Sequence, residues 1–168
     1  MPQIILFVEN NEDNIHQCDN ISCYILSDTI SNTKFNQAVA TGKMVLSYGD
    51  NALEKCKELR LDGVVKKIDV SKPVKIQLKN LRENLKHKTL GVIIPARRHE
   101  AMLAGEVEPE FMAFSSNEKG TDCEIIDWYN ELFLIPLAWI GANNITEIPK
   151  ADVDFVIVNS KNFENFGC

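Results

Sequence analysis

The chain has 168 residues, of which 45% are hydrophobic and 25% are charged, and this composition predicts one compact globular domain and excludes a disordered chain. Its formal net charge of -6 argues against non-specific binding to nucleic acid or to an anionic membrane, although a local basic patch could still recognise a small phosphorylated molecule. No apolar stretch approaches the roughly 18 residues of a membrane span, and the N-terminal segment lacks the basic and apolar regions of a signal peptide. We therefore predict a soluble, cytoplasmic protein that binds small molecules or other proteins, and neither nucleic acid nor membrane.

Eight short apolar runs rich in Ile, Val and Phe recur along the chain and predict β-strands. They lie at 4–8, 21–26, 43–48, 62–68, 89–94, 110–115, 135–140 and 154–159. Most of the intervals between them have apolar residues at helical spacing, as at 51–60, 74–85, 96–107 and 122–133. Strands that are apolar almost throughout and alternate with helices are typical of a parallel sheet covered by helices.

Eight such units predict an α/β fold, a compact single-domain (β/α)8 barrel of the TIM type that spans residues 1–168. The chain is short for a fold that usually has about 250 residues, so every connection must be minimal. An open doubly wound parallel sheet is the alternative. In both folds the ligand lies at the C-terminal ends of the strands, and the residues just after each apolar run are therefore the candidate site.

The five cysteines have irregular spacings, without a CxxC pair or a Cys/His cluster of the zinc type. Their odd number argues against a disulfide framework and favours a reducing compartment. They are Cys18, Cys23, Cys56, Cys123 and Cys168.

Several segments near the strand ends carry motifs of a known family. LRLDGVV (59–65) resembles G-A-D-G-V-H, and LGV (90–92) with HEAMLAGEVEPEFMAF (99–114) resembles I-G-V followed by E-E-A and G-A-D-Y. IPLAWIGANNITEI (135–148) resembles P-V-V-A-I-G-G-I, and DFVIVNS (154–160) resembles D-G-V-A-V-V-S. These are motifs of the thiamine-phosphate synthase and thiazole tautomerase family of (β/α)8 barrels. The chain resembles a short, divergent member of that family over nearly its whole length.

The resemblance implies a role in thiamine biosynthesis, with a phosphorylated thiazole or pyrimidine bound at the C-terminal mouth of the barrel. Gly141 and Ala142 after one strand, and Asn159 and Ser160 after the next, match the family's phosphate-binding loops. A glycine there lets the backbone approach a ligand, and backbone N–H groups can hold a phosphate. Because turns need the same residues, Gly141 could instead only make a turn.

In the synthase, the resemblance implies Mg²⁺-dependent coupling of a hydroxymethylpyrimidine diphosphate to a hydroxyethylthiazole phosphate, with release of diphosphate. Magnesium prefers hard oxygen ligands. Asp50 and Asp69 are the candidate ligands because they fall near the family's acidic residues, although each could instead cap the following helix.

The diphosphate-binding cations of the family are absent from this chain. Where the family reads V-Q-L-R-x-K, this chain has Ser27 and Thr29 in place of the arginine and lysine. Three residues remain as weak catalytic candidates. Lys119 could be a replacement cation and His99 a proton shuttle. Arg97, which with Arg98 follows the strand at 89–94, is a second candidate for a replacement cation.

Lys66 and Lys67 interrupt the strand at 62–68. One of them must face the mouth if the strand continues through both, because neighbouring side chains on a strand face opposite ways. The simpler interpretation is that the strand has ended by Lys66.

Two hypotheses therefore stay open: a weak or altered synthase-like transferase, and a non-catalytic phosphate-binding or regulatory barrel. Residues 161–168 are too few for a full eighth helix, so the apolar surface that they leave is compatible with a homodimer.

Overall fold

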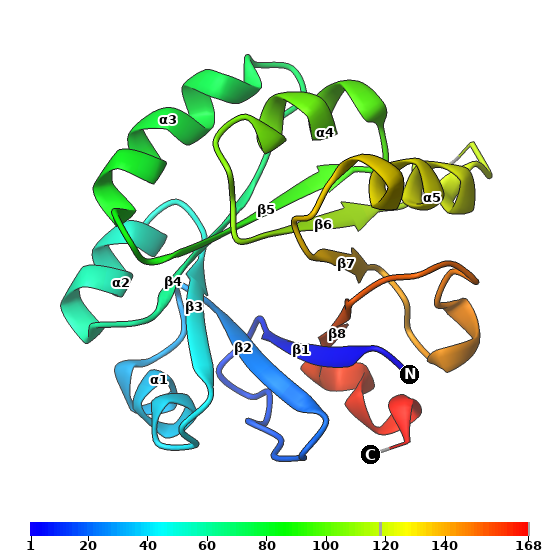
Figure 1. Cartoon of the computed structure of the whole chain (residues 1–168). Helices are drawn as coiled ribbons and strands as arrows, with labels where there is room; N and C mark the ends of the chain where they lie inside the picture. The colour runs from blue at the N-terminus through cyan, green and yellow to red at the C-terminus, as the bar shows by residue number, and fades with distance from the viewer. Residues whose placement is uncertain (118, 168) are drawn as a thin grey trace.

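The computed structural model describes residues 1–117 and 119–167, and it is a closed barrel of eight parallel strands (Figure 1). Each strand pairs with the next one in the chain, and the barrel closes where β8 pairs with β1, from Gln3 opposite Phe155 to Phe7 opposite Asn159. This topology confirms the predicted barrel and excludes the open sheet. The strands are β1 (Gln3–Val8), β2 (Ile21–Ser27), β3 (Met44–Tyr48), β4 (Gly63–Lys67), β5 (Thr89–Pro95), β6 (Phe111–Ser115), β7 (Leu137–Ile140) and β8 (Phe155–Asn159).

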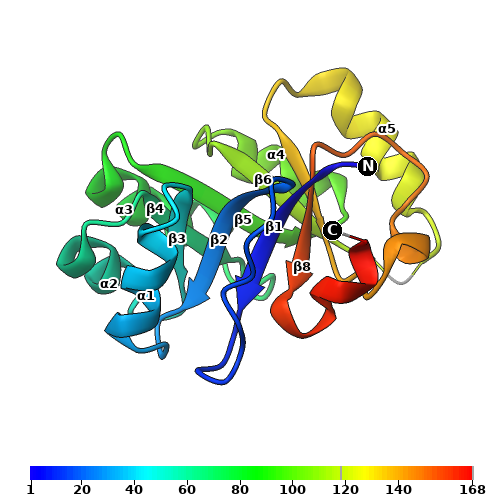
Figure 2. The ribbon, with the colours of Figure 1, turned by 90° about the horizontal axis from the view of Figure 1, so that it is seen from below.

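Five α-helices cover the outside of the barrel (Figures 1 and 2). They are α1 (Asn32–Val39), α2 (Ala52–Leu59), α3 (Val74–Leu85), α4 (Arg98–Gly105) and α5 (Asp122–Leu132). The last four confirm the helices predicted from apolar spacing. In α3, for example, Val74, Leu78 and Leu85 are buried, whereas Ile76 on the other face is 71% exposed.

Two connections, and the segment after β8, contain no α-helix, which corrects the expectation of eight strand–helix units. Residues 9–20 between β1 and β2 form an irregular loop, and short 3₁₀ helices follow β7 (η1, Ile145–Glu147) and β8 (η2, Ser160–Phe166). Because these segments have no α-helix, a chain of 168 residues is long enough to close the barrel.

The irregular β1–β2 loop is held by its own polar contacts. Asp13 is buried and accepts a hydrogen bond from the backbone N–H of Asn10 at 3.1 Å. The ring of His16 stacks on Phe163 of η2, with 4.6 Å between the ring centroids. The loop therefore packs against η2 and covers the part of the barrel wall that a helix covers elsewhere.

The strands bury side chains on both faces. One set fills the space between the barrel and its helices, and the alternate set fills the barrel interior. The interior residues are Ile5, Cys23, Ile25, Leu46, Val65, Ile93, Phe111, Ala113, Ala138 and Ile157. Because the interior is packed, a ligand on the barrel axis would lie above it, at the ends of the strands.

The cysteines differ from the expectation in one respect. Cys23, Cys56 and Cys123 are free thiols, whereas Cys18 is disulfide-bonded, although the number and spacing of the cysteines argued against a disulfide framework. Cys168 lies outside the described residues. None of the helices in the described ranges is both long and apolar enough to cross a membrane.

Candidate functional site

Two adjoining cavities open at the C-terminal ends of the strands, and we call them together the mouth. The central cavity has a volume of about 280 Å³ and is lined by Phe7, Glu9, Tyr48, Lys67, Ile93, Ser115, Ile140 and Gly141. The side cavity, beside β7 and β8, has a volume of about 190 Å³ and is lined by Phe7, Glu9, Ile140, Gly141, Ala142, Asn143, Ile157, Asn159 and Asn162. Strands far apart in the sequence thus contribute to one opening.

The floor of the mouth is apolar and partly aromatic. The rings of Phe7 and Tyr48 pack edge to face, with centroids 5.4 Å apart and an interplanar angle of 86°. Burial raises the pKa of the Tyr48 phenol, and the carboxylates of Glu9 and Asp50 raise it further. The phenol therefore stays protonated at neutral pH and can donate a hydrogen bond.

The charged residues of the mouth lie on different strands. Among the described residues that line the two cavities, only Glu9 and Lys67 carry a charge. Glu9 follows β1, and its Oε2 accepts a hydrogen bond from the amide nitrogen of Asn159 at 3.2 Å. The exposed ammonium group of Lys67 forms no ion pair within 4.0 Å in the described part of the chain.

Strand β4 continues through both of its lysines, so the simpler interpretation that it has ended by Lys66 is wrong. Lys66 and Lys67 pair in register with Val92 and Ile93 of β5. Because side chains alternate along a strand, Lys67 lines the mouth, whereas Lys66 lines an outer groove between α2 and α3.

The residues predicted to bind phosphate come together only in part. Gly141, Ala142 and Asn159 all line the side cavity. Gly141 has a φ of +114°, a conformation that favours glycine, and no atom lies within 4 Å of where a Cβ would stand. Ser160 is buried, and its hydroxyl donates to the backbone carbonyl of Asn14 at 2.7 Å.

One curated relative has the name of the family that the sequence resembles. The thiamine-phosphate synthase of Erythrobacter litoralis is 29% identical over 137 residues, which cover 73% of this chain and 62% of the relative. The chain is therefore similar in sequence to a thiamine-phosphate synthase. It spans a little under two thirds of the length of that relative. No protein-family model matches the chain.

Solved structures show the same fold at low sequence identity. The thiamine phosphate pyrophosphorylase of Pyrococcus furiosus superposes with a TM-score of 0.66 at 14% identity, over 93% of this chain and 85% of the other. A tryptophan synthase structure from M. tuberculosis superposes with a TM-score of 0.65 at 10% identity, over 95% of this chain and 82% of the other. These similarities show the barrel fold alone.

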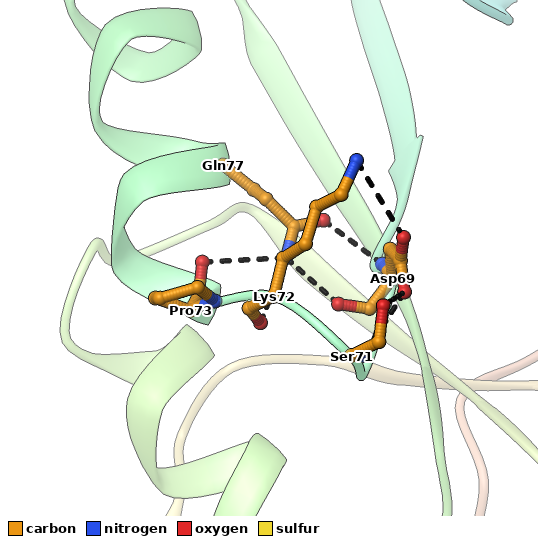
Figure 3. Close-up of polar contacts among 5 residues, drawn as sticks. All are labelled: Asp69, Ser71, Lys72, Pro73 and Gln77. Carbon is orange, nitrogen blue, oxygen red and sulfur yellow. Dashed lines mark hydrogen bonds and ion pairs between the residues drawn. The ribbon is translucent and has the colours of Figure 1, made fainter.

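Asp69, one of the two predicted metal ligands, is held within its own loop (Figure 3). Its Oδ1 accepts hydrogen bonds from the hydroxyl and the backbone N–H of Ser71 at 2.6 and 2.9 Å, and its Oδ2 lies 3.8 Å from the ammonium of Lys72. The hydroxyl of Ser71 contributes most to holding the pKa of the Asp69 carboxyl below its usual value. Gln77 completes the loop, because its side chain bonds both the N–H and the carbonyl of Asp69 at 2.9 Å.

The other predicted metal ligand, Asp50, is exposed and lines the outer groove that also contains Lys66. Neither Asp50 nor Asp69 lines the mouth. Over residues 1–117 and 119–167, no three His, Cys, Asp or Glu side chains gather as metal ligands. These two carboxylates therefore do not fit the magnesium site that the family resemblance implies, and magnesium binding stays a prediction.

The three weak catalytic candidates lie outside the mouth. Arg97 precedes α4 and pairs with Glu100 at 3.2 Å. His99 is exposed on the first turn of α4. Lys119 is also exposed, and its backbone N–H donates to the side chain of Asn117 at 3.0 Å. Their proposed roles in family chemistry stay predictions that the geometry does not support.

At the end of β2, where the family resemblance would place cations, two hydroxyl side chains bond to each other. The hydroxyls of Ser27 and Thr29 are 3.1 Å apart. Between them in sequence, the carboxylate of Asp28 accepts a hydrogen bond from the backbone N–H of Asn51 at 2.7 Å. Asp28 thus ties the loop after β2 to the loop after β3 at the rim of the mouth.

Tyr48 was missed as a residue of the mouth, and Lys67 was set aside because the strand was expected to end by Lys66. The signal for Lys67 was present, since two consecutive lysines within a strand must place one side chain on the inner face. Tyr48 ends an apolar run, where its ring is expected to be core.

Proposed function

We propose that the mouth binds a small phosphorylated heterocycle, a thiazole or pyrimidine phosphate of thiamine biosynthesis, and that the chain does not couple two such molecules efficiently. The observation that carries the proposal is the composition of the central cavity. It joins an apolar, aromatic floor to one unpaired cation, Lys67, and to the hydroxyls of Tyr48 and Ser115. The sequence similarity to a thiamine-phosphate synthase supports the ligand class.

The floor and the rim of the mouth suit different parts of such a ligand. The face of a heterocyclic ring can pack on Phe7, Ile93 and Ile140, where it is removed from water. A phosphate is recognised by ammonium, hydroxyl and N–H donors, which the rim supplies. At about 280 Å³, the central cavity is close to the lower end of the range for small-molecule sites, about 300–1,000 Å³.

Efficient coupling needs more positive charge than the chain offers. Diphosphate departs with developing negative charge, which cations stabilise. Two charge-assisted hydrogen bonds, lost where Ser27 and Thr29 replace an arginine and a lysine, amount to about 3–6 kcal/mol. If this stabilisation is lost from the transition state, the rate falls by about 10²- to 10⁴-fold. We therefore favour the binding or regulatory barrel over the active synthase.

The proposal is tested by two assays on the full chain. Isothermal titration calorimetry with hydroxyethylthiazole phosphate should give saturable binding that is at least about tenfold tighter than that of the unphosphorylated alcohol, as one charge-assisted contact predicts. Incubation with both thiamine precursors and Mg²⁺ should yield little thiamine phosphate above a heat-denatured control. Equal affinity for the phosphate and the alcohol would contradict the binding proposal, and turnover at the rate of an authentic synthase would contradict the loss of coupling.

A further inference from the structure

We propose that the outer groove between α2 and α3 binds a free α-amino acid with an aliphatic side chain, at a site separate from the mouth. The groove lies over β4, between two neighbouring helices on the outside of the barrel (Figure 1), and has a volume of about 290 Å³. The inference does not rest on the proposed function, because the groove and the mouth share no described lining residue. The groove is lined by Gly49, Asp50, Ala52, Leu53, Glu54, Val64, Val65, Lys66, Gln77, Asn80, Leu81 and Asn84.

The first observation is a lysine at a strand position that faces the helices. Lys66 lies two residues after Val64 on β4, so both side chains point outward, and Val64 is only 1% exposed. Lys66 is half-buried, and its ammonium forms no hydrogen bond or ion pair with any residue that the structure describes. The hydrogen bonds from Ser71 dominate the lowering of the pKa of Asp69, and Lys66 contributes least to it. A half-buried ammonium without a counter-ion favours an anionic group of a ligand.

Two carboxylates border the same groove. Asp50 follows β3 in the loop before α2, and Glu54 lies in the first turn of α2. Both are exposed, and neither pairs with a cation in residues 1–117 or 119–167. A ligand with only negative charge is repelled by these carboxylates, and one with only positive charge is repelled by Lys66. A zwitterion can place its anionic group at Lys66 and its cationic group at the carboxylates, and it therefore suits the groove best.

The rest of the lining is aliphatic or carries amides. Leu53 of α2 and Leu81 of α3 are half-buried, and an aliphatic side chain that packs on them is removed from water. The exposed side chain of Asn80 adds an amide that can donate to a carboxylate. No metal-binding group of three His, Cys, Asp or Glu side chains occurs among the described residues, which argues against a metal ion as the occupant. An apolar α-amino acid combines the two charges and the aliphatic side chain that this lining fits.

The test uses L-leucine and two analogues that each lack one charge. Leucinamide keeps the ammonium group but has a neutral amide in place of the carboxylate, whereas isocaproate keeps the carboxylate and lacks the amino group. Calorimetric titration of the full chain should show saturable binding of L-leucine. Its Kd should be at least about tenfold lower than that of either analogue, because each analogue loses one charge-assisted contact. Equal affinity for the three molecules, or no saturable binding of L-leucine, would overturn the proposal.

Variants of the groove assign the two charges. Lys66→Met should abolish the preference for L-leucine over leucinamide, because it removes the partner of the carboxylate. Lys79→Met is the matched control, since Lys79 is exposed on α3 and does not line the groove, and it should leave the preference unchanged. The double variant Asp50→Asn, Glu54→Gln should abolish the preference over isocaproate. A preference that survives Lys66→Met, or that is lost equally in Lys79→Met, would contradict the assignment, and circular dichroism melting confirms that each variant is folded.

The place of binding can be read from NMR titration of the same chain. L-leucine should shift the side-chain amide signals of Gln77, Asn80 and Asn84, which line the groove. Shifts centred instead on Gly141 and Asn159 would place L-leucine in the mouth and would overturn the inference, while leaving the proposed function of the mouth untouched.

Discussion

Gly49→Ala is a substitution with a clear structural expectation, because Gly49, in the loop after β3, has a positive φ and leaves no room for a Cβ. Its φ is +127°, and a Cβ there would stand 2.5 Å from the carboxylate carbon of Asp28. That carboxylate accepts the 2.7 Å hydrogen bond from the N–H of Asn51. Gly49→Ala must therefore both strain the backbone and push aside the group that joins two loops of the mouth.

The expected cost follows from these two effects. A residue other than glycine at such a φ costs about 1–3 kcal/mol, and a lost hydrogen bond to a carboxylate costs about 1.5–3 kcal/mol. Together they predict a loss of about 2.5–6 kcal/mol, which for a domain of this size lowers Tm by about 5–20 °C.

Thermal unfolding followed by circular dichroism measures the effect, with Gly42→Ala as the matched control. Gly42 also has a positive φ, +79°, but nothing lies within 4 Å of its would-be Cβ, so only a strain of about 1–2 kcal/mol is expected. In an Asp28→Ala background, the cost of Gly49→Ala should fall to the level of this control, because the clash is gone. Equal costs at the two glycines, or an unchanged cost without Asp28, would refute the reasoning.

Two other predictions concern titratable groups. Because the hydrogen bonds from Ser71 lower the pKa of Asp69 in the folded state, this carboxylate stabilises the fold above its unfolded pKa of about 3.9, and the contribution is lost as the pH falls through the folded value. The difference in unfolding free energy between the wild type and Asp69→Asn should therefore be constant from about pH 6 to 8 and shrink below about pH 4; a difference that grows in acid would contradict it. Burial raises the pKa of the Cys23 thiol to about 12, whereas Cys123 is exposed, so a thiol reagent should label Cys123 first in the native protein, as peptide mass mapping can show. Prompt labelling of Cys23 would show that the barrel interior opens.

Much of the fold could be predicted because its strands are buried on both faces. The runs at 4–8 and 154–159, for example, are nearly continuous in apolar residues, and they become the paired strands that close the barrel. The connections were less predictable. Nothing in the periodicity of residues 9–20 showed that a loop held by the buried Asp13, rather than a helix, joins β1 to β2.

The sequence predicted where the candidate site lies, at the C-terminal ends of the strands, but not which side chains meet there. Gly141 was placed at the mouth by its position after an apolar run, and it lines both cavities. The partners of Ser160 and Asp69 could not be predicted, because hydrogen bonds to Asn14 and Ser71 depend on how loops fold back on themselves. The place of Lys67 depended on a different question, whether β4 continues through both lysines, which the sequence left open.

A crystal structure of the full chain with hydroxyethylthiazole phosphate tests the central claim most directly. The account predicts the ring on the floor formed by Phe7 and Tyr48, and the phosphate within hydrogen-bonding distance of donors at the rim of the mouth. Ligand bound in the outer groove between α2 and α3, with the mouth empty at saturating concentration, would contradict the claim that the mouth is the binding site.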